Sequence, residues 1–206
     1  MRQEASTGRR RPGRARDPGI DARVLAVANH KLSTVGFEAM SLSSVAHEAG
    51  TTRQALYRRW PSKSELAADA LLAAADAGPV ATSDDPLRDL ITELTDFRRG
   101  VSLPGRLSLV GTMLQEGTDP EARARYQAKV IAPRRARILT IFERARALGL
   151  IDKDADLEVA ITLCTGSWYA RALAGSEPPK NWPARTAGLV WRAVGGAEAL
   201  EALEAG

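Results

Sequence analysis

The chain has 206 residues and few of the side chains that form covalent or metal cross-links. It contains one cysteine, Cys164, and two histidines, His30 and His47. A single cysteine excludes an internal disulfide and a cysteine-rich zinc site, and two histidines leave little for a histidine-based metal centre. We therefore expect neither a metal nor a cofactor.

Long apolar runs are also missing. No stretch approaches the ~18 consecutive apolar residues of a transmembrane helix, and the basic N-terminus lacks the apolar segment of a secretory signal. Hydrophobic residues make up 44% of the chain and charged residues 26%, which is typical of a globular domain rather than a disordered chain. We expect a cytoplasmic protein with no membrane partner.

Motifs of enzyme active sites are absent as well. The sequence contains no nucleophile elbow, phosphate-binding loop, HExxH motif or paired His/Cys cluster. His47 precedes Glu48, but adjacent residues of a helix point in different directions, so the pair indicates a solvated helix face. A helical enzyme remains only an alternative, and we predict no catalytic residues.

The positive charge is concentrated at one end. The net charge is +4, yet residues 1–63 hold 12 Lys and Arg against 5 Asp and Glu, while the rest of the chain holds 17 against 20. An N-terminal part of +7 beside a remainder of −3 favours a polyanionic partner, either nucleic acid or an anionic membrane surface. The alternative is a basic tail that only increases solubility.

The composition predicts an all-α protein. Ala, Leu, Arg and Glu dominate, and no stretch alternates in the manner of a strand. We expect a disordered basic arm over residues 1–16, a three-helix DNA-binding domain over 17–64, and a larger helical domain over 65–206. The expected helices cover about 18–34, 41–49, 52–60, 62–77, 86–101, 105–116, 120–148, 154–173 and 183–194, with a tail helix from Ala197. Pro133 predicts a kink inside 120–148.

Residues 41–60 read as a helix-turn-helix. Ser41 is a suitable N-cap for the first helix and Thr51 or Thr52 for the second, while Gly50 supplies the positive φ of a tight turn. The second helix presents six outward side chains, nearly all of them hydrogen-bond donors: Thr52, Arg53, Gln54, Tyr57, Arg58 and Arg59. Base edges and phosphates are mostly acceptors, so the pattern favours a recognition helix. A structural αα-hairpin with a solvated basic face is the alternative.

The same stretch carries a family resemblance. The segments Val35-Gly36-Phe37, Met40 to Ala46, Ala49 to Thr52 and Leu56 to Lys63 resemble the N-terminal domain of the tetracycline-repressor (TetR-like) family of bacterial transcription regulators. Gln54 and Arg59 depart from the residues common in that family. The resemblance implies a homodimeric repressor that leaves a palindromic operator when a small effector binds. A regulator without a small-molecule ligand is the alternative.

From this motif and the family resemblance, we predict contacts with double-stranded DNA for seven residues. Ser41 and Thr52 cap their helices and contact phosphate, while Tyr57 and Lys63 bind phosphate. Arg53 suits the O6 and N7 atoms of guanine, and Gln54 suits the N6 and N7 atoms of adenine. Arg59 reaches phosphate or base. The arginines of the arm, Arg9, Arg10, Arg11, Arg14 and Arg16, are candidates to lie along the DNA backbone or to enter a minor groove, although the sequence does not decide whether the arm contacts DNA.

In a protein of this family the remaining helices imply a ligand pocket and a dimer interface. Apolar stripes favour a four-helix contact between two subunits, formed by Ile161, Cys164, Trp168, Val190, Trp191 and Val194. The alternative is that these stripes face the subunit's own core. For a hydrophobic or amphipathic effector we predict a pocket lined by Phe97, Met113, Leu114, Tyr126, Phe142 and Tyr169.

Overall fold

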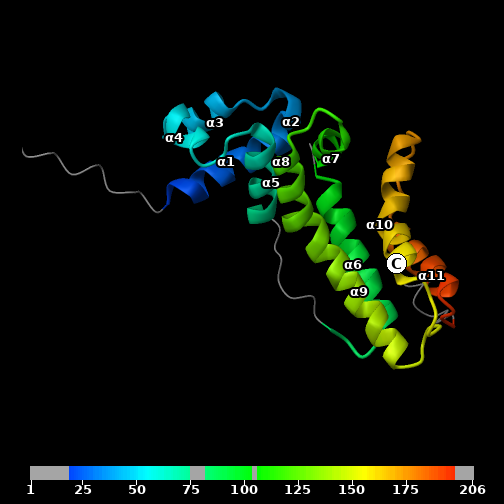
Figure 1. Ribbon diagram of the computed structural model, residues 1–206. Coiled ribbons are helices and arrows are strands. Elements are labelled where there is room, and N and C mark those ends of the chain that lie inside the picture. Colours follow the sequence, from blue (N-terminus) through cyan, green and yellow to red (C-terminus); the bar gives the residue numbers. More distant parts are fainter. Residues whose placement is uncertain (1–18, 75–81, 104–105, 198–206) are drawn as a thin grey trace, which may run out of the picture.

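The computed structural model describes residues 19–74, 82–103 and 106–197. Every regular element within these ranges is a helix (Figure 1), and the predicted all-α fold is confirmed. No helix in these ranges combines the length and apolarity needed to cross a bilayer. The predicted basic arm and the tail helix predicted beyond Ala197 lie outside the described residues.

The N-terminal helices begin and end at residues that sequence patterns can identify. They are α1 (Ile20–Thr34), α2 (Gly36–Ala39), α3 (Leu42–Glu48), α4 (Arg53–Tyr57) and α5 (Lys63–Ala74). The backbone N–H of Ser44 donates to Ser41 Oγ at 3.1 Å, and that of Ala55 donates to Thr52 Oγ1 at 3.1 Å. Gly50 has a φ of 70°. The predicted caps and turn of the helix-turn-helix are therefore confirmed.

The following helices form an elongated body. They are α6 (Pro86–Val101), α7 (Arg106–Leu114), α8 (Pro120–Tyr126), α9 (Ala132–Ala147), α10 (Leu157–Leu173) and α11 (Trp182–Ala193). The start predicted for α10 at Asp154 was wrong. Asp156 is the N-cap, since its carboxylate accepts from the N–H of Val159, whereas the N–H of Asp154 donates to Asp152 Oδ1 in the preceding turn.

A π-helical turn, η1 (Gln127–Ile131), separates α8 from α9. Pro133 has no N–H to donate to the carbonyl of Lys129, and its ring crowds the preceding turn. The helix predicted over 120–148 is therefore interrupted one turn before the proline. A widened π turn is one of the known ways in which a helix departs from regular α geometry.

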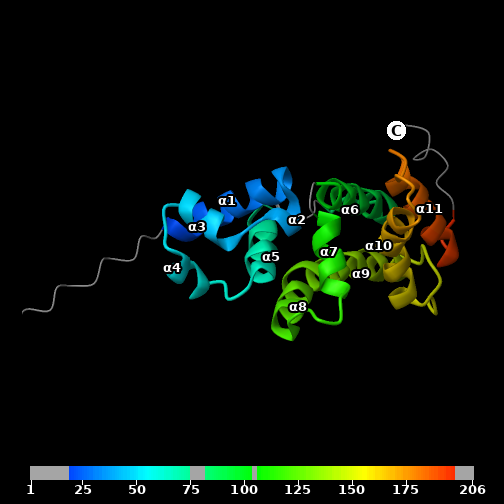
Figure 2. The same ribbon diagram turned by 90° about the horizontal axis from the view of Figure 1, so that it is seen from above.

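Two hydrophobic cores follow one another along the subunit. The first is formed by α1 to α5 together with Leu109 and Met113 of α7 and Tyr126 of α8. The second is formed by α6, α9, α10 and α11. Seen from above, α3 and α4 lie at one end and α10 and α11 at the other, with α6 to α9 between them (Figure 2).

Candidate nucleic-acid interface

Helix α4 is fixed through its inner side and presents its outer side to solvent. Leu56 and the adjoining Trp60 are buried in the first core. Arg53, Gln54 and Tyr57 are exposed on the opposite side. A helix of five residues is too short to be stable alone, so its caps and these two buried anchors hold the donor-rich face in place.

The side chains of Arg53 and Tyr57 contact each other and hold each other in place. Arg53 Nη2 donates to the Tyr57 hydroxyl at 3.1 Å, and the guanidinium lies 5.2 Å from the centroid of the ring. The hydroxyl accepts this bond, so its own O–H is available to donate to a phosphate. Two neighbouring donors thus face outward from α4 with part of their rotamer freedom already lost.

Arg59 is tied to the subunit instead. Its Nε lies 2.6 Å from Asp21 Oδ1 of α1, and its Nη1 donates to the carbonyl of Ala55 at 3.2 Å. The side chain is only 25% exposed. This arrangement braces α1 against α4, and contact with DNA requires Arg59 to leave Asp21. Arg58, which we predicted to face outward without giving it a contact, is exposed.

Lys63 lies at the start of α5, where its ammonium group is 4.5 Å from the centroid of Phe37 and donates to the carbonyl of Glu38 at 3.1 Å. It is half-buried, whereas Ser41 and Thr52 are exposed at the N-termini of α3 and α4. The helix-turn-helix thus brings all seven predicted DNA contacts to one end of the subunit. Five of them are exposed, while Arg59 and Lys63 make contacts within the subunit.

The residues predicted for the dimer interface lie in the second core of their own subunit. Ile161, Cys164, Trp168, Val190, Trp191 and Val194 are between 0% and 5% exposed. Side chains covered by their own chain have almost no area left for a partner, so this burial favours the alternative of an intramolecular core. Consistent with this burial, the pKa of the Cys164 thiol is raised to about 12.

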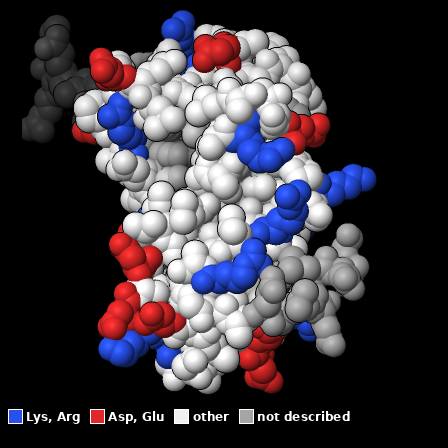
Figure 3. Space-filling view, turned by 90° about the vertical axis from the view of Figure 1, so that its right-hand side faces the viewer, with Lys and Arg blue, Asp and Glu red and all other residues white. Residues whose placement is uncertain are grey.

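A different stripe of α10 is exposed. Val159, Leu163 and Leu173 are 54%, 49% and 88% exposed, and together with Gly166 and Ala170 they recur at helical spacing. The exposed stripe and the buried stripe have the same helical spacing, so spacing alone does not distinguish them. Figure 3 shows this side of the molecule, where uncharged side chains predominate, basic side chains cross the middle and acidic ones lie toward the edges.

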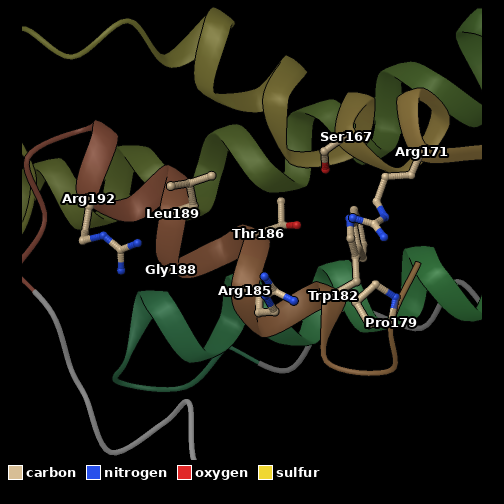
Figure 4. Close-up of a pocket in the computed structure, with 9 residues that line it drawn as sticks. All are labelled: Ser167, Arg171, Pro179, Trp182, Arg185, Thr186, Gly188, Leu189 and Arg192. Atoms are coloured by element: carbon tan, nitrogen blue, oxygen red, sulfur yellow. The ribbon is translucent and has the colours of Figure 1, made fainter. Parts of the chain in front are cut away.

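A groove of about 480 Å³ runs between α10 and α11. Figure 4 shows Ser167 and Arg171 of α10 facing Trp182 and Thr186 of α11 across it. Ser167 Oγ and Trp182 Nε1 are buried without a hydrogen-bond partner among the described residues.

The six residues predicted to line an effector pocket do not surround one described cavity. Met113 and Tyr126 belong to the first core, whereas Phe97 and Phe142 belong to the second. Leu114 is 78% exposed. Tyr169 packs against the second core and meets the ring of Phe97 edge to face at 5.7 Å. None of the six lines the groove between α10 and α11.

Family models match two parts of the chain. Residues 24–70 match the bacterial regulatory proteins of the tetR family, and residues 81–190 match the tetracyclin repressor-like C-terminal domain. The chain belongs to the TetR family. It is therefore a helix-turn-helix transcriptional regulator, and the predicted resemblance is confirmed along both the DNA-binding end and the body.

Individual relatives and solved structures match most of the chain. The HTH-type transcriptional regulator YdeS of Bacillus subtilis is 27% identical over 93% of this chain and 96% of its own length. The crystal structure of the TetR-family regulator SCO0332 has a TM-score of 0.69 and 29% identity, covering 87% of this chain and 99% of that one. FadR of Bacillus subtilis, solved with stearoyl-CoA, has a TM-score of 0.61 at 13% identity, covering 86% and 99%.

Proposed function

We propose that this protein is a homodimeric, sequence-specific repressor of the bacterial cytoplasm, released from a palindromic operator by a small molecule. The donor-rich outer side of α4 is the observation that carries the proposal. In the proposed mechanism, residues 17–64 bind DNA, whereas residues 65–206 bind the effector and the second subunit. Arg53 and Gln54 contact base edges, while Ser41, Thr52, Tyr57 and Lys63 contact phosphates. Arg59 joins them only if it leaves Asp21.

Dimerisation sets the spacing of the two recognition helices. A stripe of α10 (Val159, Leu163, Gly166, Ala170 and Leu173), exposed except for the half-buried Gly166, and Leu189 of α11 face away from the second core. We assign the dimer contact to this set, which we call the α10–α11 face. It lies at the far end of the subunit from α4 (Figure 2). A two-fold axis there separates the two copies of α4, and binding requires them to match two half-sites about 34–36 Å apart.

Polar contacts join the recognition helix to the body. Trp60, directly beyond α4, donates its Nε1–H to Asp69 Oδ2 at 3.1 Å, and Lys129 of the π turn donates to Asp69 Oδ1 at 2.7 Å. Glu65 of α5 is buried and lies 2.9 Å from Arg125 of α8. Helix α5 is thus bound to α8 and η1 at two points. A movement of this helix is the proposed route by which the body changes the spacing of the two α4 helices.

Release by a ligand follows from differential binding. An effector that binds better to a subunit with the wrong spacing shifts the population away from the DNA-bound form. FadR, which shares this fold, was solved in complex with stearoyl-CoA, and this supports the proposal that a protein of this fold responds to a small molecule. Its ligand is not carried over to this chain.

Footprinting on DNA that flanks the protein's own gene tests the proposal. We expect a protected palindrome and a specific complex that survives ~150 mM salt, because specific contacts persist where purely electrostatic ones are lost. The matched control is the double variant Arg53→Ala, Gln54→Ala, which leaves the caps Ser41 and Thr52 unchanged. If wild type and this variant bind all sequences alike, the proposal fails.

A further inference from the structure

A polar cluster lies where the two cores meet. Tyr126 of α8 belongs to the first core, whereas Phe97 of α6 and Tyr169 of α10 pack in or against the second. The guanidinium of Arg134 on α9 lies 5.1 Å from the centroid of Phe97. Arg106, at the start of α7, is near enough to interact electrostatically with Tyr126 and Arg134. We call Arg106, Tyr126, Arg134 and Tyr169 the Arg–Tyr cluster.

The positive charge of this cluster is poorly compensated. Arg134 Nε lies 3.4 Å from Glu93 Oε1, but both oxygens of that carboxylate already accept hydrogen bonds from Arg137, at 2.8 and 2.9 Å. Within the described ranges, no carboxylate forms an ion pair with Arg106. Arg106 is half-buried, and desolvation lowers its pKa. An anion brought between the two arginines would relieve an unfavourable arrangement of charge.

The two tyrosines add donors but no negative charge. Burial raises the pKa of Tyr169 to about 12 and also raises the pKa of Tyr126. Both hydroxyls therefore remain protonated at neutral pH and can donate hydrogen bonds to an anionic oxygen. Two guanidinium groups and two phenols are a donor set suited to an oxyanion.

We propose that the Arg–Tyr cluster binds the carboxylate of an amphipathic effector whose apolar body packs against the half-buried ring of Tyr169. This inference rests on the proposed function and names the chemical class of the effector. The position also explains how binding acts on DNA. A carboxylate held jointly by α7, α8, α9 and α10 pulls elements of the first core toward those of the second, and α8 is joined to α5 through Arg125 and Glu65.

A matched pair of probes tests the proposal on the full-length protein. Pyrenebutanoate and pyrenebutanol have the same apolar body and differ in the carboxylate. Their dissociation constants are measured by energy transfer from tryptophan, because Trp168 and Trp182 lie 6.3 and 5.8 Å from Phe97 between ring centroids. We expect wild type to bind pyrenebutanoate roughly tenfold or more tightly than pyrenebutanol, since a charge-assisted bond replaces a neutral one.

Single substitutions show which residues cause the preference for pyrenebutanoate over pyrenebutanol. Arg106→Met and Arg134→Met are each expected to remove most of it, and Arg134→Lys to retain part. Arg88→Met removes an exposed charge elsewhere on α6, and Arg171→Met removes one from the groove between α10 and α11. Both should keep the preference of wild type. Thermal unfolding identifies any variant that fails to fold. If Arg134→Met does not fold, Arg106→Met, which changes a residue at the edge of the cluster, provides the second test.

Three results overturn the inference: equal binding of the two probes by wild type, a preference that survives both cluster variants, or a preference lost in Arg171→Met. Operator binding, measured in parallel by footprinting, separates this failure from failure of the proposed function. Wild type that binds its operator but shows no carboxylate preference refutes only the inference. Wild type that binds no operator refutes the repressor, whatever the probes do.

Discussion

The subunit has two exposed faces of opposite chemistry. On α4, Arg53, Gln54 and Tyr57 present hydrogen-bond donors, which match the acceptors of a nucleic acid. On the α10–α11 face, Leu163, Leu173 and Leu189 present apolar surface, which gains free energy only when another apolar surface covers it. The first face should bind in a strongly salt-dependent manner, and binding by the second should depend less on salt.

The largest effect is expected from a charge on the α10–α11 face. Leu163→Arg would place two guanidinium groups in the dimer contact, and unpaired buried charges cost at least about 3 kcal/mol. Light scattering should show a monomer at micromolar concentration, and operator affinity should fall at least 100-fold. Leu148→Arg, at an exposed leucine beyond α9, is the matched control. If the Leu163→Arg variant is still a dimer, the dimer interface is not the α10–α11 face.

The next largest effect is expected from single contacts on α4. Arg53→Ala and Gln54→Ala should each cost about 1–3 kcal/mol on the preferred operator and less on operators altered at one base pair, because each side chain reads a base edge. Titrations against a set of single-base operator variants measure this. The same loss on every sequence would mean that these residues contact phosphate only.

The connection between the two faces should show a smaller effect. In Asp69→Asn, Lys129 loses an ionic partner and Trp60 a charged acceptor, which should lower the free energy of unfolding by about 1–1.5 kcal/mol. Urea denaturation gives the value. Asp96→Asn breaks a solvent-exposed ion pair with Arg99 and should stay within about 0.5 kcal/mol of wild type. If the two variants cost the same, Asp69 does not couple α4 to the body.

The smallest effect is expected from a phosphate contact. Lys63→Ala should weaken binding to all sequences alike, by roughly 1 kcal/mol, and reduce the slope of log affinity against log salt by about 1. Titrations between 50 and 200 mM salt, about the range over which such contacts are lost, give the slope. Lys153→Ala is the control, since Lys153 is exposed and, among the residues that the structure describes, pairs only with the adjacent Asp154. A sequence-dependent loss in Lys63→Ala would contradict the assignment.

These two faces also differ in how well the sequence predicted them. Ser41, Gly50 and Thr52 act on backbone groups within a few residues of themselves, so their roles follow from local sequence alone. The two sides of α10 carry apolar residues at similar spacing, and only the packing of α6, α9 and α11 determines that Ile161 and Cys164 are buried while Leu163 is exposed.

The residues predicted for the pocket show the same limit. Phe97 and Tyr126 are apolar residues on helices of the body, but nothing local indicates that they belong to different cores. Likewise, Ser62-x-x-Glu65 is the sequence pattern of a capping box. The N–H of Glu65 does donate to Ser62 Oγ, whereas the carboxylate instead pairs with Arg125, which is sixty residues away in the chain.

The π turn between α8 and α9 sets the rotational phase of everything that follows it. Accommodating one additional residue in a single turn rotates later side chains by about 100° relative to an uninterrupted α-helix. The continuous helical segment of α8, η1 and α9 can therefore place Tyr126 in the first core and Ile138 and Phe142 in the second. Deleting a single residue between Tyr126 and Pro133 would make the helix more regular, yet it would turn the second core's residues away from their partners.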